Sequence, residues 1–231
     1  MGRKILIVGG VAGGASAAAR LRRNNEDDQI IMFERGPHIS FSNCSLPYHL
    51  SGIVKEADNL VLMKPELFLK QYNIEARINS EVIAINRDDK TVTVRKTDTD
   101  EEYTESYDKL ILSPGARPIA PKLPGMEKVN IFTVRNVVDI DNLNKFIKNM
   151  KTKDVAVIGG GFIGVEVAEN LRLGGYNVTL IEASNQILRP YDYDMVQIFH
   201  KVMLDNKVNL ILGDKVEKFE EDKVILASGK T

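Results

Sequence analysis

The sequence has a single cysteine and almost no net charge, and each of these features excludes a class of protein. The single cysteine, Cys44, cannot form an intramolecular disulfide, so the chain is no secreted domain held together by disulfides, and a cytoplasmic location is expected. Lys and Arg number 31 against 32 for Asp and Glu, which leaves no basic excess for nucleic acid. The three histidines lack metal-ligand spacing, so no metal site is expected.

Long hydrophobic runs are missing as well. The one stretch to consider is the uncharged segment 5–19, which follows Arg3 and Lys4 as the core of a signal peptide would. Glycines interrupt this segment, and it falls short of the ~20 apolar residues of a membrane span. We therefore expect neither export nor membrane insertion. With 43% hydrophobic and 27% charged residues, the composition is that of an ordinary globular protein.

What the sequence does contain is a repeat of strand, glycine turn, helix and strand. The first copy has an apolar run at 5–8, a glycine cluster, an Ala-rich helical stretch at 12–23 and a second apolar run at 29–33. The second copy has apolar runs at 155–158 and 178–181 on either side of a glycine cluster and a helix. Each copy is typical of a βαβ unit. We therefore predict an α/β fold with two Rossmann-like dinucleotide-binding domains of the three-layer ββα type.

Between the two copies the pattern changes from helical to alternating. Residues 81–86, 90–96 and 101–107 alternate apolar residues with threonine and charged residues, with turn residues between them. This alternation predicts a small antiparallel meander, followed by a strand at 109–112.

A proline-rich connection separates the two copies. Three prolines lie between Arg117 and Gly125, where no helix or strand is expected. We place the domain boundary there, with one domain at 1–118 and another at 119–231. Because the last residues resemble a strand entering a turn, the chain is expected to be a fragment of a longer protein.

The second glycine turn has the full G-x-G-x-x-G pattern between a strand and a helix. Its glycines let the backbone approach a pyrophosphate, and the helix N-terminus offers unpaired N–H groups. Glu182 follows the last glycine by 18 residues and is placed to accept a hydrogen bond from a ribose hydroxyl. Its charge repels a 2′-phosphate, so NAD(H) is favoured over NADP(H). The cofactor-binding residues predicted in this turn are Gly159, Gly161, Phe162, Ile163 and Gly164.

The first glycine turn departs from this pattern at its middle position, where Val11 stands in place of glycine. Glu34 nevertheless follows the last glycine by 20 residues, as the acid of a dinucleotide site would. Two dinucleotides in one chain indicate a flavin and a nicotinamide, and we assign FAD to the first turn and NAD to the second. The cofactor-binding residues predicted here are Gly9, Val11, Ala12, Gly13 and Gly14.

The single cysteine has the surroundings of a redox-active thiol. Asn43 is a competent N-cap, and residues 46–50 are compatible with a short helix that tolerates Pro47 in its first turn. A helix N-terminus stabilises a thiolate, so we interpret Cys44 as catalytic rather than as an inert buried cysteine. Without a second cysteine, catalysis has to pass through a mixed disulfide, a persulfide or a sulfenic acid.

Three segments carry a resemblance to a known family: 8–20 with its G-G-V-A-G-G turn, 40–48 with S-F-S-N-C, and 112–118 with S-P-G-A-R-P. Together they resemble coenzyme A-disulfide reductases. These belong to the single-cysteine branch of the flavin-dependent pyridine nucleotide-disulfide oxidoreductases, which also holds NADH oxidases, NADH peroxidases and NADH-dependent persulfide reductases. The resemblance implies that hydride passes from NADH to FAD, and electrons then pass to the sulfur of Cys44, which reduces coenzyme A (CoA) disulfide or CoA persulfide.

The resemblance also implies roles for individual residues. Those matching CoA contacts are Ser16, Arg20, Arg23, Ser40 and Asn43. Those matching FAD contacts are Glu34, Arg35, Val82, Ser113, Pro114, Gly115 and Arg135. Glu166 matches the glutamate that meets the nicotinamide. Relatives are roughly twice as long and carry a C-terminal dimerisation domain, so the full-length parent is expected to be a homodimer.

Two alternatives remain beside the CoA-linked reductase. The first is an NADH oxidase or peroxidase whose Cys44 cycles as a sulfenic acid, although residues 12–25 lack the catalytic histidine that such relatives usually carry near the first helix. The second is a truncated, noncatalytic dinucleotide-binding fragment. Ser45, which stands where the family usually has glycine, is a further departure beside the nucleophile.

Overall fold

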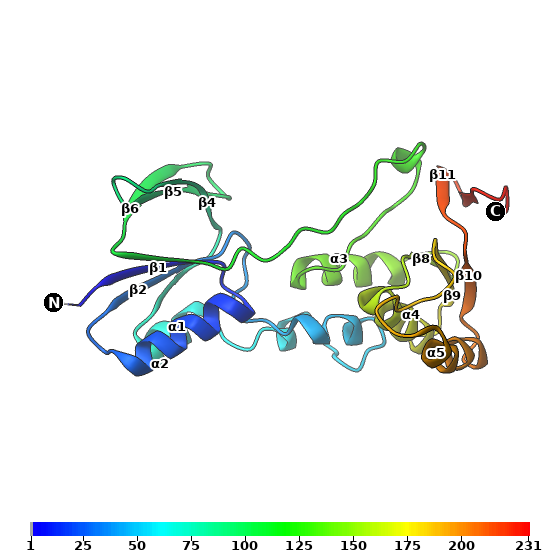
Figure 1. The fold of residues 1–231 in the computed structure, drawn as a ribbon, viewed down its shortest axis with the longest axis horizontal. Helices are drawn as coiled ribbons and strands as arrows, with labels where there is room; N and C mark the ends of the chain where they lie inside the picture. Colours follow the sequence, from blue (N-terminus) through cyan, green and yellow to red (C-terminus); the bar gives the residue numbers. More distant parts are fainter. Residues whose placement is uncertain (1) are drawn as a thin grey trace. The chain divides into compact units, whose positions relative to one another are not determined.

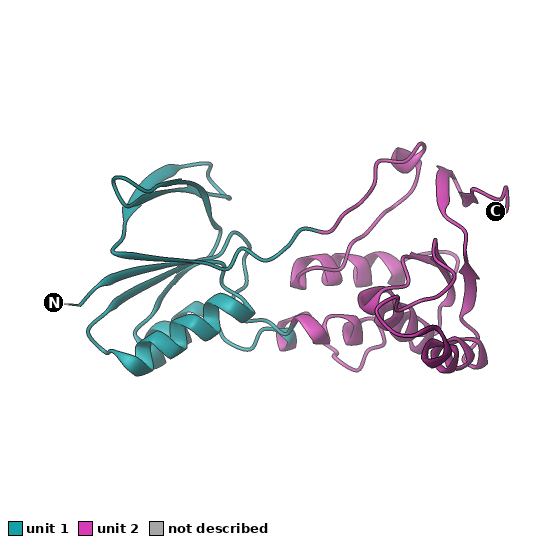
Figure 2. Cartoon of the chain, in the orientation of Figure 1, with its two compact units in different colours: residues 1–42, 60–117 teal, residues 43–59, 118–231 magenta. Residues whose placement is uncertain are grey.

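The computed structural model describes residues 2–231, which fold as two compact units (Figure 2). The first unit comprises the chain up to Ser42 and residues 60–117, and the second comprises residues 43–59 and 118–231. The chain enters the second unit for the last time at residue 118, in the proline-rich connection. The segment 43–59, which contains Cys44, also belongs to the second unit, so a single boundary in the sequence does not separate the two units.

The first unit is built on a four-stranded parallel sheet with the order β3-β2-β1-β7 (Figure 1). Apolar runs form the central strands, and Ile7 of β1 pairs with Met32 of β2 and Ile111 of β7. The strands are β1 (Lys4–Val8), β2 (Gln29–Phe33), β3 (Glu75–Arg77) and β7 (Lys109–Leu112). The helices of this unit are α1 (Ala12–Asn24) and α2 (Pro65–Tyr72).

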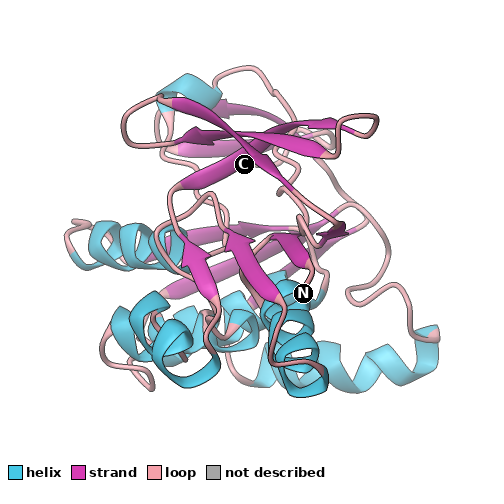
Figure 3. Ribbon diagram, turned by 90° about the vertical axis from the view of Figure 1, so that its left-hand side faces the viewer, coloured by secondary structure: helices cyan, strands magenta, loops and turns pink. Residues whose placement is uncertain are grey.

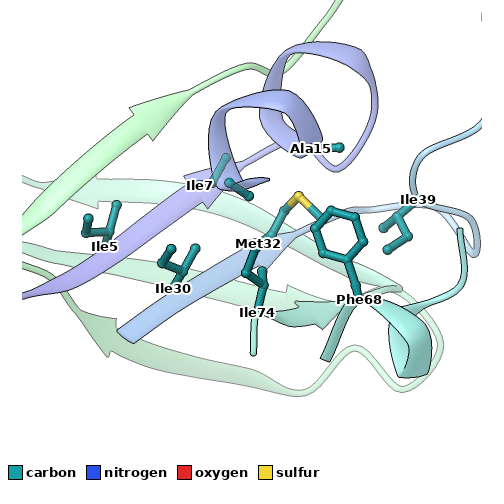
Figure 4. Packing of buried hydrophobic residues seen from close by; sticks show 9 residues of the cluster. Ile5, Ile7, Ala15, Ile30, Met32, Ile39, Phe68 and Ile74 are labelled. Carbon is teal, nitrogen blue, oxygen red and sulfur yellow. The ribbon is translucent and has the colours of Figure 1, made fainter. Parts of the chain in front are cut away.

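Helices cover one face of this sheet. Successive residues of a strand point to opposite faces, so one alternate set from β1 and β2 packs on α1 and α2. Figure 4 shows this cluster, in which Ile7, Met32 and Phe68 are almost fully buried. Its other buried members are Ile5, Ala15, Ala18, Ile30, Ile39 and Ile74. Each large member contributes about 1.5–3 kcal/mol by leaving water.

An antiparallel meander covers the opposite face. Its strands are β4 (Ser80–Asn86), β5 (Thr91–Lys96) and β6 (Glu102–Ser106). Val92 and Val94 of β5 pack on the other alternate set, which consists of Leu6, Ile31 and Phe33. The parallel sheet therefore lies between helices and meander, and Figure 3 views these layers from the side. The predicted three-layer ββα arrangement is confirmed in this unit.

The second unit repeats the strand–helix–strand order on a three-stranded parallel sheet, β10-β9-β8. Its strands are β8 (Asp154–Ile158), β9 (Asn177–Glu182) and β10 (Asn209–Leu212), with a hairpin of β11 (Val216–Glu220) and β12 (Lys223–Leu226). Its helices are α3 (Val137–Lys148), α4 (Phe162–Leu173) and α5 (Tyr193–Asp205). The hairpin packs Val216, Phe219 and Leu226 against Ile181 of β9.

The predicted helix at 12–23 and the helix predicted between the apolar runs of the second copy are confirmed as α1 and α4, and so are the predicted strands around them. The short helix predicted at 46–50 is present as the 3₁₀ helix Pro47–His49, with Leu46 and Leu50 as its cap residues and Pro47 in its first turn. A separate 3₁₀ turn, Asn43–Ser45, precedes it and contains Cys44. Among residues 2–231, no helix has both the length and the apolar character to span a bilayer.

Candidate functional site

The first glycine turn joins β1 to α1 at the carboxyl end of the sheet. Gly9 has a φ of +100°, and a Cβ there would lie 2.0 Å from the carbonyl oxygen of Ser113. A Cβ at Gly14 would lie 1.8 Å from the carbonyl oxygen of Gly9. Only glycine permits this approach of α1 to the strand that precedes it. The turn is therefore brought against Ser113, a second residue of the predicted FAD set.

Glu34 fixes the neighbouring strand end to the same turn. One oxygen of its carboxylate accepts the backbone N–H of Gly10 at 2.8 Å, and the other accepts the N–H of Gly36 at 3.0 Å. The carboxylate thus lies beside the glycine turn, where the ribose of a dinucleotide bound at α1 would come.

The second turn repeats this construction between β8 and α4. Gly159 has a φ of +105°, and a Cβ at Gly164 would lie 1.9 Å from the carbonyl oxygen of Gly159. The carboxylate of Glu182 accepts the backbone N–H of Gly160 at 2.7 Å and that of Ser184 at 2.8 Å. Burial opposes the charge of Glu182, but these hydrogen bonds outweigh it and hold the pKa of the carboxyl below its usual value.

The middle glycine of the second turn has no packing reason within the described chain. A Cβ added to Gly161 would meet no atom of residues 2–231 within 4 Å, and the φ of Gly161 is an ordinary −75°. A missing side chain beside open space is what the close approach of a ligand to the backbone requires.

Of the five α-helices in residues 2–231, only α3 has a side-chain cap, and among the uncapped helices only α1 and α4 begin at a glycine turn. At α3 the side chain of Asn136 accepts the N–H of Asp139 at 2.8 Å. The N-cap residues of α1 and α4, Val11 and Gly161, provide no side-chain cap. N–H groups left without a side-chain acceptor at a glycine turn form an anion site. Turn, uncapped helix and carboxylate therefore fit a dinucleotide at each of the two places.

The remaining residues of the predicted FAD set are divided between the units. Ser113, Pro114 and Gly115 follow β7 in the first unit, where the backbone N–H of Ser113 donates to Val8. The same unit contains Val82, which lies on β4, and Arg35, which follows β2. Arg135 lies in the second unit, just before α3, and its backbone N–H donates to Asp139.

The predicted CoA set is likewise divided. Ser16, Arg20 and Arg23 are exposed and follow one another at helical spacing along α1, so they share a face. Neither arginine forms an ion pair within residues 2–231. Ser40, with a φ of +46°, belongs to the first unit and donates its N–H to Gly10, while Asn43 is exposed in the second.

Arg22 shows what a structural arginine on the same helix is like. It is buried, and its guanidinium donates to backbone carbonyl oxygens that include those of Tyr72, Asp28 and Asn73. Arg22 follows the buried Ala15 and Ala18 at helical spacing, and this position distinguishes it from Arg23. This contrast leaves Arg20 and Arg23 as the cations of α1 that are available to a ligand.

Cys44 is exposed and lies in the middle of the first 3₁₀ turn. The expectation that a helix dipole activates it is therefore wrong, because the segment has no helix of sufficient length. His49 and Ser51, whose side chains bind this segment to neighbouring helices, were not predicted from the sequence. Their partners Asn144 and Asn170 are polar residues at otherwise apolar helix positions, and this was the available sign of the two hydrogen bonds.

Glu166 and the exposed Phe162 and Ile163 lie in the first turns of α4. Glu166 borders a groove of about 400 Å³ between α4 and α5. Phe162 meets Tyr191 in this groove, edge to face, with ring centroids 5.9 Å apart. Tyr191 was not predicted from the sequence. Helix α5 has more apolar residues than one buried face requires, among them the exposed Phe199 and Val202, and this excess was the available sign of the groove.

Comparisons with known proteins agree with this geometry. Residues 3–231 match the family model described as pyridine nucleotide-disulphide oxidoreductase. The chain is similar to a coenzyme A disulfide reductase of Staphylococcus haemolyticus, with 39% identity over 98% of this chain and 51% of the relative. It therefore spans about half the length of the curated relatives it matches.

Two solved structures extend the comparison. The structure of reduced Bacillus anthracis CoADR-RHD matches all of this chain and 42% of that one, with a TM-score of 0.96 and 48% identity. A NAD-dependent persulfide reductase from A. fulgidus matches 98% of this chain and 43% of that one, with a TM-score of 0.92 and 30% identity. By sequence and by fold, the chain belongs to the pyridine nucleotide-disulphide oxidoreductase family.

Proposed function

We propose that this chain is the dinucleotide-binding part of an enzyme that uses NADH and FAD to reduce CoA disulfide or CoA persulfide at Cys44. The observation that carries the proposal is the repeated turn. Each unit has a glycine turn, a helix N-terminus without a side-chain cap, and a carboxylate bound to the turn. Two such sites in one chain suit an enzyme that takes electrons from one dinucleotide and relays them through another.

The second unit is the proposed NADH site. Glu182 is held ionised by the backbone N–H groups of Gly160 and Ser184, so a 2′-phosphate placed beside it would be repelled. Residues 159–164 would receive the pyrophosphate, and Glu166, four residues into α4, would approach the nicotinamide. We therefore assign residues 119–231 to NAD(H).

The first unit is the proposed FAD site. Residues 9–14 would receive the pyrophosphate of FAD, and Glu34 its ribose, with Ser113 beside the turn. Bound FAD would supply the step from a two-electron hydride donor to a sulfur acceptor. The first unit, residues 2–42 and 60–117, is accordingly assigned to FAD.

Cys44 is the proposed nucleophile and sulfur carrier. Its thiolate would attack a CoA disulfide, forming a Cys44–CoA mixed disulfide and releasing one CoA as its thiolate; two electrons and a proton would then release the second CoA as a thiol and restore the Cys44 thiolate. The exposed face of Ser16, Arg20 and Arg23 suits the phosphates of CoA. The names of the relatives, coenzyme A disulfide reductase and persulfide reductase, support this substrate class. We expect the complete enzyme to be a cytoplasmic homodimer.

The test measures NADH consumption by the FAD-loaded chain. CoA disulfide and CoA persulfide are offered as acceptors without air, and oxygen is offered in a separate assay in air. We expect a CoA-linked acceptor to be used fastest and Cys44→Ser to abolish that turnover, because no other thiol is present. The matched variant Ser42→Ala changes a neighbouring hydroxyl and should retain turnover. If oxygen is consumed fastest, the enzyme is an oxidase; if NADH is not consumed at all, the chain is only a binding fragment.

A further inference from the structure

The segment that carries Cys44 is tied to the second unit by two side-chain hydrogen bonds. His49 is buried, and its Nε2 accepts from Nδ2 of Asn144 on α3 at 2.8 Å. The hydroxyl of Ser51 donates to Oδ1 of Asn170 on α4 at 2.8 Å. Figure 2 shows residues 43–59 in the colour of this unit. Because the two bonds reach different helices, the segment cannot shift along either helix without losing one of them.

The chemistry of the first bond is fully determined by its partners. Nδ1 of His49 lies 2.8 Å from the carbonyl oxygen of Val54, which can only accept, so Nδ1 carries the proton and Nε2 is the acceptor for Asn144. Asn144 is itself only 4% exposed. Loss of either side chain would leave a buried polar group without its partner, which makes this pair specific as well as stabilising.

Close packing accompanies the two bonds. Leu46, Pro47 and Leu50 of the segment are buried. At the end of α4, a Cβ on Gly174 would lie 2.7 Å from the carbonyl oxygen of Leu50. Backbone therefore meets backbone at this point, and any displacement of α4 is passed to the segment rather than absorbed by flexible side chains.

The same helix leads back to the proposed NADH site. Nδ2 of Asn170 donates to the carbonyl oxygen of Glu166, one turn closer to the start of α4. Helix α4 begins at Phe162, directly after Gly161. One rigid element thus has the glycine turn at its beginning and the attachment of the Cys44 segment in its second half. Coupling between two sites needs an element of this kind, whose position both sites influence.

We propose that the pairs His49–Asn144 and Ser51–Asn170 are positioning contacts through which a dinucleotide bound at the α4 turn changes the reactivity of Cys44. The inference rests on the proposed function, since it requires NADH to bind at that turn. It goes beyond that function because NADH binding would change the reactivity of the Cys44 thiol through contacts within the protein, separately from the transfer of electrons.

The test uses the flavin-free chain and the rate at which iodoacetamide alkylates Cys44. Because Cys44 is the only cysteine, the rate reports on one residue. In the unsubstituted chain, saturating NADH should change this rate by on the order of fivefold or more. In Ser51→Ala and in His49→Ala the ratio with and without NADH should fall close to one. His49→Gln, which retains a donor and an acceptor, should recover part of the coupling.

A matched control separates coupling from general loosening. Asn149→Ala removes an amide-to-carbonyl hydrogen bond to Lys145 on α3, the helix that carries Asn144, but away from the Cys44 segment, and should leave the ratio unchanged. Thermal melting shows whether each variant folds. If His49→Ala does not fold, the test rests on Ser51→Ala, because Ser51 is only half-buried and its substitution disturbs the packing less.

NADH fluorescence, measured on the same samples, separates the two ways of failing. If NADH binds but leaves the alkylation rate unchanged, or changes it equally in Ser51→Ala, the positioning role is wrong and the proposed function stands. If NADH does not bind the unsubstituted chain, the proposed nucleotide site is wrong, and this inference fails with it.

Discussion

The two glycine turns have the same backbone construction in spite of different side chains. In each, a strand-end carboxylate binds two backbone N–H groups, and the carbonyl of the second glycine accepts an N–H from a residue at positive φ. That residue is Ser40 in the first unit and Leu188 in the second, with φ of +46° and +49°. A leucine in this conformation is unusual. The comparison shows that the two turns share their glycine spacing and their backbone hydrogen bonds, and that the side chains between them can differ.

The turns differ in what requires their first glycine. A Cβ at Gly9 would strike Ser113 at the end of β7, whereas one at Gly159 would meet nothing within 4 Å in residues 2–231. The reason lies in the sheets: β1 pairs with both β2 and β7, whereas β8 pairs only with β9 among the described strands. In the first unit both the positive φ of Gly9 and its packing demand glycine, whereas in the second the positive φ of Gly159 demands it without a packing contact.

The largest expected effect tests the shared part of the two turns. Gly14→Ala and Gly164→Ala should each lower the free energy of unfolding by about 2–3 kcal/mol, because the added methyl group would meet a carbonyl oxygen at 1.8 or 1.9 Å. Urea denaturation of both variants measures this. A large loss in one variant and none in the other would show that the two turns are not built alike.

A smaller effect tests the difference between them. Gly161→Ala should leave the free energy of unfolding nearly unchanged, since its methyl group enters open space, yet weaken NADH binding on the order of tenfold, about 1.4 kcal/mol. NADH fluorescence titration and urea denaturation measure the two quantities. The control is Val11→Ala at the matching position of the first turn, which should leave NADH affinity as it is. Unchanged NADH affinity in Gly161→Ala would contradict the account.

The smallest effect concerns a histidine beside the second turn. His200 on α5 accepts the N–H of Ile187 through Nε2, and burial lowers its pKa from the usual value. Above about pH 6.5 the ring is neutral in both the folded and the unfolded chain. Below this pH the unfolded chain takes up the proton more readily, so stability falls as the pH falls.

The expected loss through His200 is below about 1 kcal/mol near pH 5.5. The measurement is the difference in melting temperature between pH 7.5 and pH 5.5, compared with the same difference in His200→Gln. The variant should show the weaker dependence on pH. Equal dependence in both proteins would show that His200 does not contribute.

Local patterns predicted much of this fold, and contacts distant in sequence explain the rest. The apolar runs of β1, β2, β8 and β9 and the glycine spacing before α4 were sufficient for both βαβ units. The attachment of residues 43–59 to the second unit was not predictable, because it depends on Asn144 and Asn170, more than ninety residues away in the sequence. Propensity and capping rules favoured a short helix at 46–50, where the 3₁₀ helix Pro47–His49 forms, but they did not predict the separate 3₁₀ turn that contains Cys44.

The candidate site divides in the same way. Glu34 and Glu182 were identified by their distance from a glycine turn, and each carboxylate does bind the turn. The division of the α1 arginines into the exposed Arg20 and Arg23 and the buried Arg22 follows from helical spacing, but the carbonyl oxygens of Tyr72 and Asn73 that Arg22 binds lie about fifty residues away and were not predictable.

The most direct test of the central claim, that the second turn is an NADH site selected by Glu182, is a pair of fluorescence titrations with NADH and NADPH. The account predicts that NADH binds at least about tenfold more tightly. In Glu182→Gln the preference should shrink, because the charge that repels the 2′-phosphate is gone while one oxygen remains to accept an N–H. Equal affinities in the unsubstituted chain, or a preference for NADPH, would contradict it.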